Sequence, residues 1–385
     1  MNLDPIVATF LLLLLLAVGE IISIYTHARI PMLLTAMLGY LVLTWTGIFP
    51  ENITELSTIP ALASVAIAPL ILHMGTLMSF DVLKKQWRAV VIALGGLVGA
   101  LTLVLTVITL LFDFETAASG IGPLSGGVIA LLITTERLTE IGLTALIVVP
   151  VMIQAFQTPI GMPLATFFMR KYSKYFLGHK EEFKETYRIS LDEENSVATR
   201  PNLLQNNLIL LTIVIGFGAV AMLLSKVTPI HYTLYALVFG ILLVNLKVLP
   251  KAALEKANSF TFLMTALMIV IINTLGGITP SDVIKNLPAV FMLLFVGISG
   301  ILIGGFIFSK LVGWHPNKGM PVALTALLGF PADYILCEEV ARGETDNEED
   351  KKALFEELVS PMVIGGFVTV TVSSVFIASI IMGML

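Results

Sequence analysis

Runs of about twenty apolar residues recur along this 385-residue chain and constrain what it can fold into. A helix of about 20 residues crosses the hydrocarbon core of a bilayer, which is roughly 30 Å thick. Hydrophobic residues make up 57% of the chain and charged residues only 13%. That charged share is about half of what a soluble domain carries. The runs therefore predict an all-α membrane protein.

Ten such runs occur, five on each side of a polar stretch. We expect transmembrane helices near 5–25, 31–49, 60–78, 88–112, 142–168, 203–225, 231–249, 259–277, 288–313 and 358–384. Two further apolar segments, about 119–141 and 319–341, are interrupted by Gly, Pro, Thr and charged residues. A broken helix at membrane depth is tolerated only where protein or a water-filled cavity satisfies its backbone groups. Each broken segment is therefore expected to be a re-entrant hairpin.

The chain repeats itself at a separation of about 200 residues. PVMIQAFQT (150–158) and PMVIGGFVT (361–369) agree at four of nine positions. GTLMSFDVLK (75–84) and GGITPSDVIK (276–285) agree at Gly, Asp, Val and Lys, in the same order along the chain. Such matches indicate an internal duplication.

The duplication divides the chain into three parts. A first five-helix repeat would occupy 1–168, a cytoplasmic connector 169–202, and a second five-helix repeat 203–385. If the N-terminus lies outside, nineteen Lys and Arg residues fall in cytoplasmic loops and two in outer loops. The positive-inside rule favours this orientation, which also places the C-terminus outside. Five is an odd number, so the second repeat must be inverted relative to the first. Inverted repeats with broken helices are the architecture of secondary transporters.

Composition narrows the alternatives. The single cysteine, Cys337, excludes an intrachain disulfide and a cysteine-based zinc site. The N-terminal run has no basic flank or small-residue cleavage site, so we interpret it as a retained first helix. No motif for a nucleophile, a cofactor or nucleic acid is present. We therefore expect neither an enzyme nor a bound cofactor beyond a coupling ion.

Ionisable residues in the broken segments are the candidates for ion coupling. A charge at mid-membrane costs roughly 2.5–3.5 kcal/mol even on lenient scales, so such residues should line a polar cavity, pair, or lie near the interface. Carboxylates among hydroxyls suit Na⁺ or a proton better than a soft metal. The ion-coupling candidates are Glu136, Glu140, Asp333 and Glu338, with a Na⁺ site at Glu140 and Asp333. The cavity containing Glu136, Glu140 and Asp333 would carry more negative charge than Arg137 balances.

Polar residues beside these acids are the candidates for solute binding. They are Arg137, Thr134, Thr135, Thr139, Gln154, Gln157 and Tyr334. Arg137 would bind a carboxylate through its planar guanidinium. Three structural alternatives stay open: Arg137 pairs with a neighbouring Glu, Glu338 is solvated, and the glutamines hydrogen-bond between helices. His73 is a lone ionisable residue within an expected transmembrane helix, and a role in proton coupling is one hypothesis for it.

The layout resembles the sodium/glutamate symporter family and the related 2-hydroxycarboxylate transporters. The closest local likenesses are PLILHMGTLMSFDVLKK (69–85) and ELVSPMVIGGFVTVTVSSV (357–375). The resemblance covers nearly the whole chain in order and spacing, but not the hairpin sequences TTERLTEIG and GFPADYILCEE. It implies an elevator-type, sodium-coupled carrier that forms a homodimer. By the same analogy, spans 1–2 and 6–7 would form the scaffold.

The function expected from these features is ion-coupled secondary transport across the plasma membrane. The solute would be a small organic anion or an amino acid such as glutamate, with Na⁺ as the coupling ion. Proton coupling, export of another solute, and a non-transporting channel or sensor remain alternatives. The expected partners are the solute, the lipid bilayer and a second copy of the chain.

The predicted topology can be tested by cysteine labelling. A cysteine at position 180 should react with an impermeant maleimide only after the membrane is opened, because the connector is expected to be cytoplasmic. A cysteine at the C-terminus should react in intact cells. Labelling of position 180 from outside would contradict the topology.

Overall fold

The computed structural model describes residues 3–77, 86–143, 146–183, 206–228, 232–273 and 280–385. Every regular element among these residues is a helix, which confirms the all-α prediction. Most of the predicted connector 169–202, and parts of both copies of the 75–84 repeat, lie outside the described residues.

The two halves of the chain contain the same order of helices. The first half runs α1 (Pro5–Tyr25), α2 (Met32–Trp45), α3 (Ile53–Leu56), α4 (Ile59–Thr76), α6 (Trp87–Leu103), η1 (Val104–Ile108), α7 (Thr109–Leu111), α8 (Phe114–Leu124), α9 (Val128–Glu140), α10 (Val148–Gly178) and η3 (Lys180–Phe183). The second half runs α12 (Asn207–Val227), α13 (Tyr232–Asn245), α14 (Ala253–Lys256), α15 (Phe260–Asn273), α16 (Pro280–Leu311), α17 (Pro316–Leu328), α18 (Ala332–Glu344), α19 (Glu348–Phe367), η5 (Val368–Ser373) and α20 (Ser374–Gly383). Two pairs of corresponding helices have equal lengths: α1 and α12 both have 21 residues, and α2 and α13 both have 14.

Seven helices in the described residues are long and apolar enough to cross a membrane. They are Pro5–Tyr25, Ile59–Thr76, Trp87–Leu111, Val148–Gly178, Asn207–Val227, Asn286–Leu311 and Glu348–Gly383. The other three expected spans correspond to shorter apolar helices, α2, α13 and α15, of 14 residues each. Fourteen residues rise about 21 Å, which is less than the hydrocarbon thickness. The chain is thus a helical, membrane-embedded protein, with seven of ten expected spans at full length.

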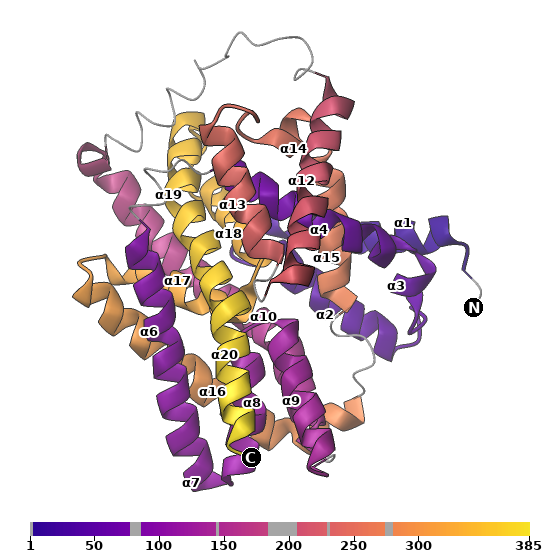
Figure 1. Ribbon diagram of the computed structural model, residues 1–385, viewed down its shortest axis with the longest axis vertical. Coiled ribbons are helices and arrows are strands. Elements are labelled where there is room, and N and C mark those ends of the chain that lie inside the picture. The colour runs from indigo at the N-terminus through magenta and orange to yellow at the C-terminus, as the bar shows by residue number, and fades with distance from the viewer. Residues whose placement is uncertain (1–2, 78–85, 144–145, 184–205, 229–231, 274–279) are drawn as a thin grey trace. The chain divides into compact units, whose positions relative to one another are not determined.

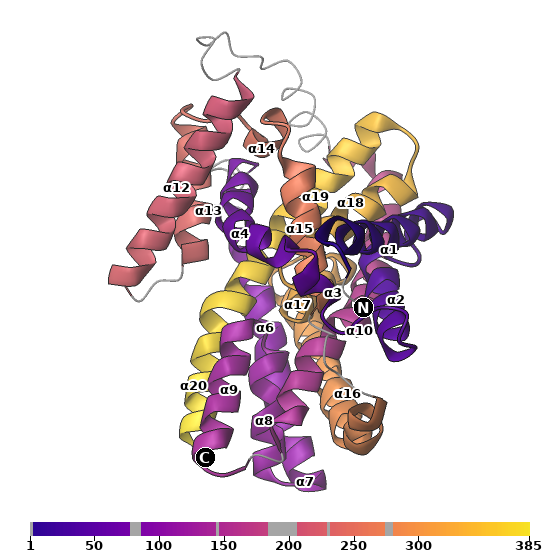
Figure 2. The same cartoon turned by 90° about the vertical axis from the view of Figure 1, so that its right-hand side faces the viewer.

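The helices form two compact units, each of which takes segments from both halves. One unit comprises Met1–Leu14, Pro50–Lys85 and Asp192–Asn273. The other comprises Leu15–Phe49, Gln86–Leu191 and Thr274–Leu385, and it holds both broken segments (Figure 1). In this unit α8, α9 and α20 lie side by side in both views (Figures 1 and 2).

Contacts in the first unit are exchanged between the two halves. His73 on α4 accepts a hydrogen bond at Nδ1 from the backbone N–H of Leu254, at 3.2 Å. Asn273 on α15 accepts one at Oδ1 from the hydroxyl of Thr54, at 2.6 Å. Residues 54 and 254, and residues 73 and 273, are each 200 apart (254 − 54 and 273 − 73). Each half therefore contacts the other through the same pair of positions.

Glycines allow a close helix crossing in the second unit. The main chains of α6 and α16 meet where Gly99 faces Gly300, and a Cβ built on Gly300 would lie 2.5 Å from the carbonyl oxygen of Gly99. Small residues at helix crossings let backbones approach, which is how helices associate in a membrane. Gly99 and Gly300 are again about 200 residues apart in sequence.

Helix α2 belongs to the unit that contains the hairpins, which differs from the expected grouping of spans 1–2 with a scaffold. Helix α2 packs against α10 of this unit, and the buried carboxylate of Glu339 on α18 accepts the N–H of Met32 at the start of α2, at 3.0 Å. Arg342 also pairs with Glu20 on α1, at 2.7 Å. These contacts attach the α1–α2 corner to the second hairpin.

Candidate functional site

Both broken segments are helix pairs interrupted by three residues. Hairpin 1 consists of α8 and α9 with a turn at 125–127, and hairpin 2 consists of α17 and α18 with a turn at 329–331. Their helices have 11 to 13 residues and so rise at most about 20 Å. The stretches 116–124 and 332–337 are buried throughout, so surrounding protein encloses the interrupted backbone.

Sequence explains where these helices begin and end. The Asp113 carboxylate accepts the N–H of Thr116 at 2.6 Å and caps α8. His315 does the same for α17 by accepting the N–H of Asn317 at 3.2 Å, with Pro316 in the first helical position. The turns contain Gly126, Gly127 and Gly329, which have φ values of 103°, 87° and 65°. Glycine adopts positive φ without steric cost, so these positions end the helices.

The two turns meet at a π-helical segment. A Cβ on Gly126 would lie 2.8 Å from the Ala326 carbonyl oxygen, and one on Gly127 would clash with the carbonyl oxygen of Val370. A Cβ on Gly329 would contact Val370 at 3.4 Å. Val370 belongs to η5, the π-helical break between α19 and α20. Such π segments occur frequently at functional sites. Three irregular stretches of backbone thus converge on one point.

Helix α10 runs antiparallel to α17 and brings two glutamines to the same depth. Lys318 near the start of α17 lies 5.6 Å from the ring of Tyr172, and near its end the Leu327 carbonyl accepts the Thr158 hydroxyl at 2.9 Å. The turn of hairpin 2 therefore lies beside residues that precede Thr158. Gln154 and Gln157 are at this level, and their Oε1 atoms accept no hydrogen bond from a described residue.

Asp333 is the charged residue at this junction. Its side chain is fully buried in the first turn of α18. Oδ1 accepts the N–H of Tyr334 at 2.8 Å, whereas Oδ2 accepts no hydrogen bond from a described residue. A Cβ on Gly366 would lie 2.5 Å from Oδ2 and 3.8 Å from Cβ of Thr325. The carboxylate is therefore enclosed between α17, α18 and α19.

No basic side chain among the described residues balances Asp333. Lys318 on α17 pairs with Glu357 on α19. Lys318 is seven residues from Thr325, about 10 Å along the helix. The start of α18 contributes only a partial charge, equivalent to about half an elementary charge. An isolated buried carboxylate costs several kcal/mol unless it takes a proton, pairs or coordinates a cation.

The structure separates the predicted ion site into two places. Glu136 and Glu140 are exposed toward the far end of α9, while Asp333 is buried beside the turn of the other hairpin. Arg137 pairs with Glu140 at 3.2 Å and donates from Nε to the carbonyl of Met382 at 3.3 Å. Met382 is 16 residues beyond Gly366, about 24 Å along α19 to α20. The Arg137–Glu140 pair thus agrees with the structural alternative.

The remaining predicted residues divide between structural and site positions. The Thr134 hydroxyl bonds to the carbonyl of Ala130, and Thr139 bonds to Thr135, so these hydroxyls serve α9 itself. Glu338 is exposed, and the ring of Tyr334 packs edge-on against Phe355. Of the predicted set, Asp333 lies at the junction, and Gln154 and Gln157 lie within one turn of Thr158 on the neighbouring α10.

Sequence reasoning missed three residues at the junction: Thr158, Thr325 and Gly366. Gly366 carries a signal that could have been used, because the second copy of the repeated phrase has a Gly-Gly pair where the first copy has Gln154 and Ala155. A pair of glycines in a helix marks close approach by another group, here hairpin 2.

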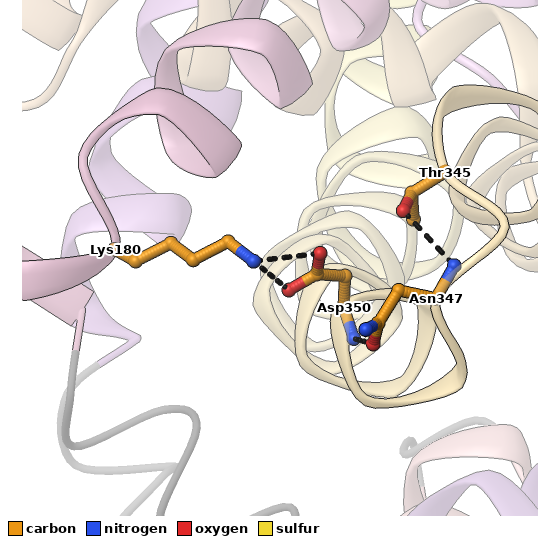
Figure 3. Close-up of polar contacts among 4 residues, drawn as sticks. All are labelled: Lys180, Thr345, Asn347 and Asp350. Carbon is orange, nitrogen blue, oxygen red and sulfur yellow. Dashed lines mark hydrogen bonds and ion pairs between the residues drawn. The ribbon is translucent and has the colours of Figure 1, made fainter.

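Polar contacts hold the far end of hairpin 2. Arg170 on α10 pairs with Glu344 at 2.7 Å and also donates to the carbonyl of His27. Figure 3 shows the next contact along, in which Lys180 reaches both carboxylate oxygens of Asp350, at 2.6 and 2.7 Å. Asn347 caps α19 by accepting the N–H of Asp350 at 3.1 Å. These pairs lie at the base of hairpin 2, and no described residue forms an ion pair at its turn.

Chemically, the junction offers the Asp333 carboxylate and the neighbouring hydroxyl of Thr325, and two amides lie within one turn of Thr158 on α10. Within the described residues no group of three or more His, Cys, Asp or Glu side chains could hold a metal ion. Oxygen ligands of this kind suit a proton or a hard monovalent cation.

Neither a protein-family model nor a curated protein matches this chain.

Gly366 provides a test of the junction. Replacing it by Ala would place a methyl group 2.5 Å from Asp333 Oδ2, so the carboxylate or the hairpin must move. We expect Gly366→Ala to destabilise the protein by about 1–3 kcal/mol, as overpacking does. Gly216→Ala is the control, because a Cβ there meets nothing within 4 Å and Ala favours a helix. Equal melting temperatures for the two variants in detergent would contradict the geometry.

Proposed function

We propose that this protein is an ion-coupled secondary carrier whose binding site is the junction of the two hairpin turns. The observation that carries the proposal is the buried, unbalanced carboxylate of Asp333 beside three interrupted stretches of backbone. In secondary transporters, substrate and ions bind near the midplane, where broken helices of two repeats meet. The protein is proposed to act in the plasma membrane, with both termini outside.

The fold supports this proposal through its duplication. We propose that residues 1–168 and 203–385 are inverted repeats of five membrane helices, each with a re-entrant hairpin. The shared helix order, the exchanged contacts of His73 and Asn273, and the Gly99–Gly300 crossing are what a pseudo-twofold relation requires. The repeats resemble those of sodium/glutamate symporters in layout.

The unit that contains both hairpins is proposed to be the moving part. It joins hairpins 1 and 2 to the helices that follow them, α10 and α19–α20. Attachment of α2 to hairpin 2 through Glu339 means that α2 would move with this unit. In an elevator-type carrier the other unit would provide the fixed scaffold and the contact between two copies.

Asp333 is proposed to be the ion-coupling residue. In the proposed transport cycle, the Asp333 carboxylate binds a proton or a cation on one side of the membrane and releases it on the other. Glu136, Glu140 and Glu338, which are exposed, are then dispensable for coupling. Na⁺ is the coupling cation that the oxygen ligands favour, with a proton as its competitor.

Replacing Asp333 by Asn tests the site. Asparagine removes the buried charge at nearly constant volume. The melting temperature of the wild type should rise as the pH falls from 8.5 to 5.5, and should rise with Na⁺ at pH 8.5 and fixed ionic strength. A ligand at one hundred times its Kd stabilises by about 2.7 kcal/mol. Asp333→Asn should lose both responses and melt higher at pH 8.5 without Na⁺.

Asp346→Asn is the matched control. Asp346 is exposed two residues after α18, so this variant makes the same chemical change outside the junction. It should keep both responses. If Asp333→Asn responds to pH and Na⁺ as the wild type does, Asp333 is not a coupling residue and the proposed site is wrong.

A further inference from the structure

We propose that the junction holds one monovalent cation at a time, so that the protein exchanges a proton for a small cation instead of carrying an organic anion together with Na⁺. This inference rests on the proposed function and specifies its substrate class and its direction. The alternative expected from the sequence was an anion bound by Arg137. The charges around Asp333 decide between them.

Charge balance is the first step. Among the described residues, hairpin 2 and the helices packed on it, α6, α10, α16 and α19, place one ionisable carboxylate, that of Asp333, at the turn. Beyond it, α18 carries Cys337 and Glu339 one and two turns further, and Glu339 already accepts the N–H of Met32. The Lys318–Glu357 pair lies toward the other end of α17. One bound positive charge therefore neutralises the site, and a second would leave it charged again.

An anion fits this site poorly. A carboxylate or phosphate beside ionised Asp333 would place two negative charges in a space from which water is largely excluded. The nearest candidate counter-charge that the sequence suggested, Arg137, is bound to Glu140 and to the carbonyl of Met382. That carbonyl is about 24 Å along the helix from Gly366. The amides of Gln154 and Gln157 are neutral and supply no compensation.

A cation fits it well. Asp333 Oδ2 accepts no hydrogen bond from a described residue, and the Val370 carbonyl oxygen of η5 lies beside the turn of hairpin 1. Such oxygen atoms can ligate Na⁺ or Li⁺, or attract the positive charge of a quaternary ammonium ion. Because the proton and the cation would occupy the same oxygen, each excludes the other. A carrier that crosses the membrane only when its carboxylate is neutralised must then exchange one for the other.

The test measures proton movement in proteoliposomes that contain the full chain and an internal pH-sensitive dye. Vesicles with an acidic lumen receive external Na⁺, Li⁺, K⁺ or tetramethylammonium as chloride salts. We expect at least one of these cations to drive protons out of the lumen. Asp333→Asn should lower the initial rate at least about tenfold, and Asp346→Asn should leave it unchanged. Protein-free liposomes correct for leakage.

Competition gives the second readout. Where Asp333 is protonated, the half-saturating cation concentration should rise about tenfold for each unit of external pH decrease, because the proton concentration rises tenfold. The identity of the active cation separates the sources: Na⁺ or Li⁺ indicates an inorganic site, and tetramethylammonium indicates a site for organic ammonium groups.

Two results would overturn the inference. One is that none of the four cations moves protons, and the other is a half-saturating concentration that is the same at pH 6 and pH 8. Radiolabelled glutamate or citrate in the same vesicles separates the two proposals. If either accumulates under a Na⁺ gradient and depends on Asp333, the carrier stands and the exchange is wrong. If neither flux occurs and Asp333→Asn melts like the wild type, both proposals fail.

Discussion

A carboxylate buried without a counter-charge is the constraint on which the junction depends. Asp333 is fully buried, and no basic side chain among the described residues forms an ion pair with it. Burial of an ionised carboxylate is costly in proportion to the water it loses. The site can therefore be stable only when something positive enters it. Burial makes the empty, ionised site unfavourable. The same burial would make the site select positively charged ligands over neutral or negative ones.

Irregular backbone is concentrated beside Asp333, whereas ion pairs and close helix packing hold the surrounding helices in place. Both hairpin turns and η5 meet at Val370, whereas the base of hairpin 2 is held by Arg170, Lys180 and Arg342. Glycines at the α6–α16 crossing allow close packing of the helices that support the hairpins. The helices around the junction are firmly packed, whereas Asp333 Oδ2 at its centre accepts no hydrogen bond from a described residue. We expect this arrangement of a site that must bind and release an ion.

The fold class, the helix order and the two interrupted segments could be predicted from sequence, because each rests on a local pattern: apolar runs, and breaks at Gly126 or Gly329. Asp333 could be identified because an acid beside a Gly-Phe-Pro turn has few structural explanations. Sequence alone could not show whether Arg137 and Glu140 lie near Asp333. The distance between them depends on how the two hairpins pack: Arg137 and Glu140 are at the far end of α9, whereas Asp333 is at the start of α18, beside the turn. The placement of α2 depends on a long-range contact from Glu339 to Met32, which no local pattern encodes.

The central claim is that Asp333 is neutralised by either a proton or a cation, and infrared difference spectroscopy tests it most directly. Reconstituted protein would be exchanged between a Na⁺-free buffer at low pH and a Na⁺ buffer at high pH. We expect a protonated-carboxyl band that disappears on exchange in the wild type and in Asp346→Asn, and that is missing in Asp333→Asn. An identical difference spectrum in the wild type and Asp333→Asn would contradict it.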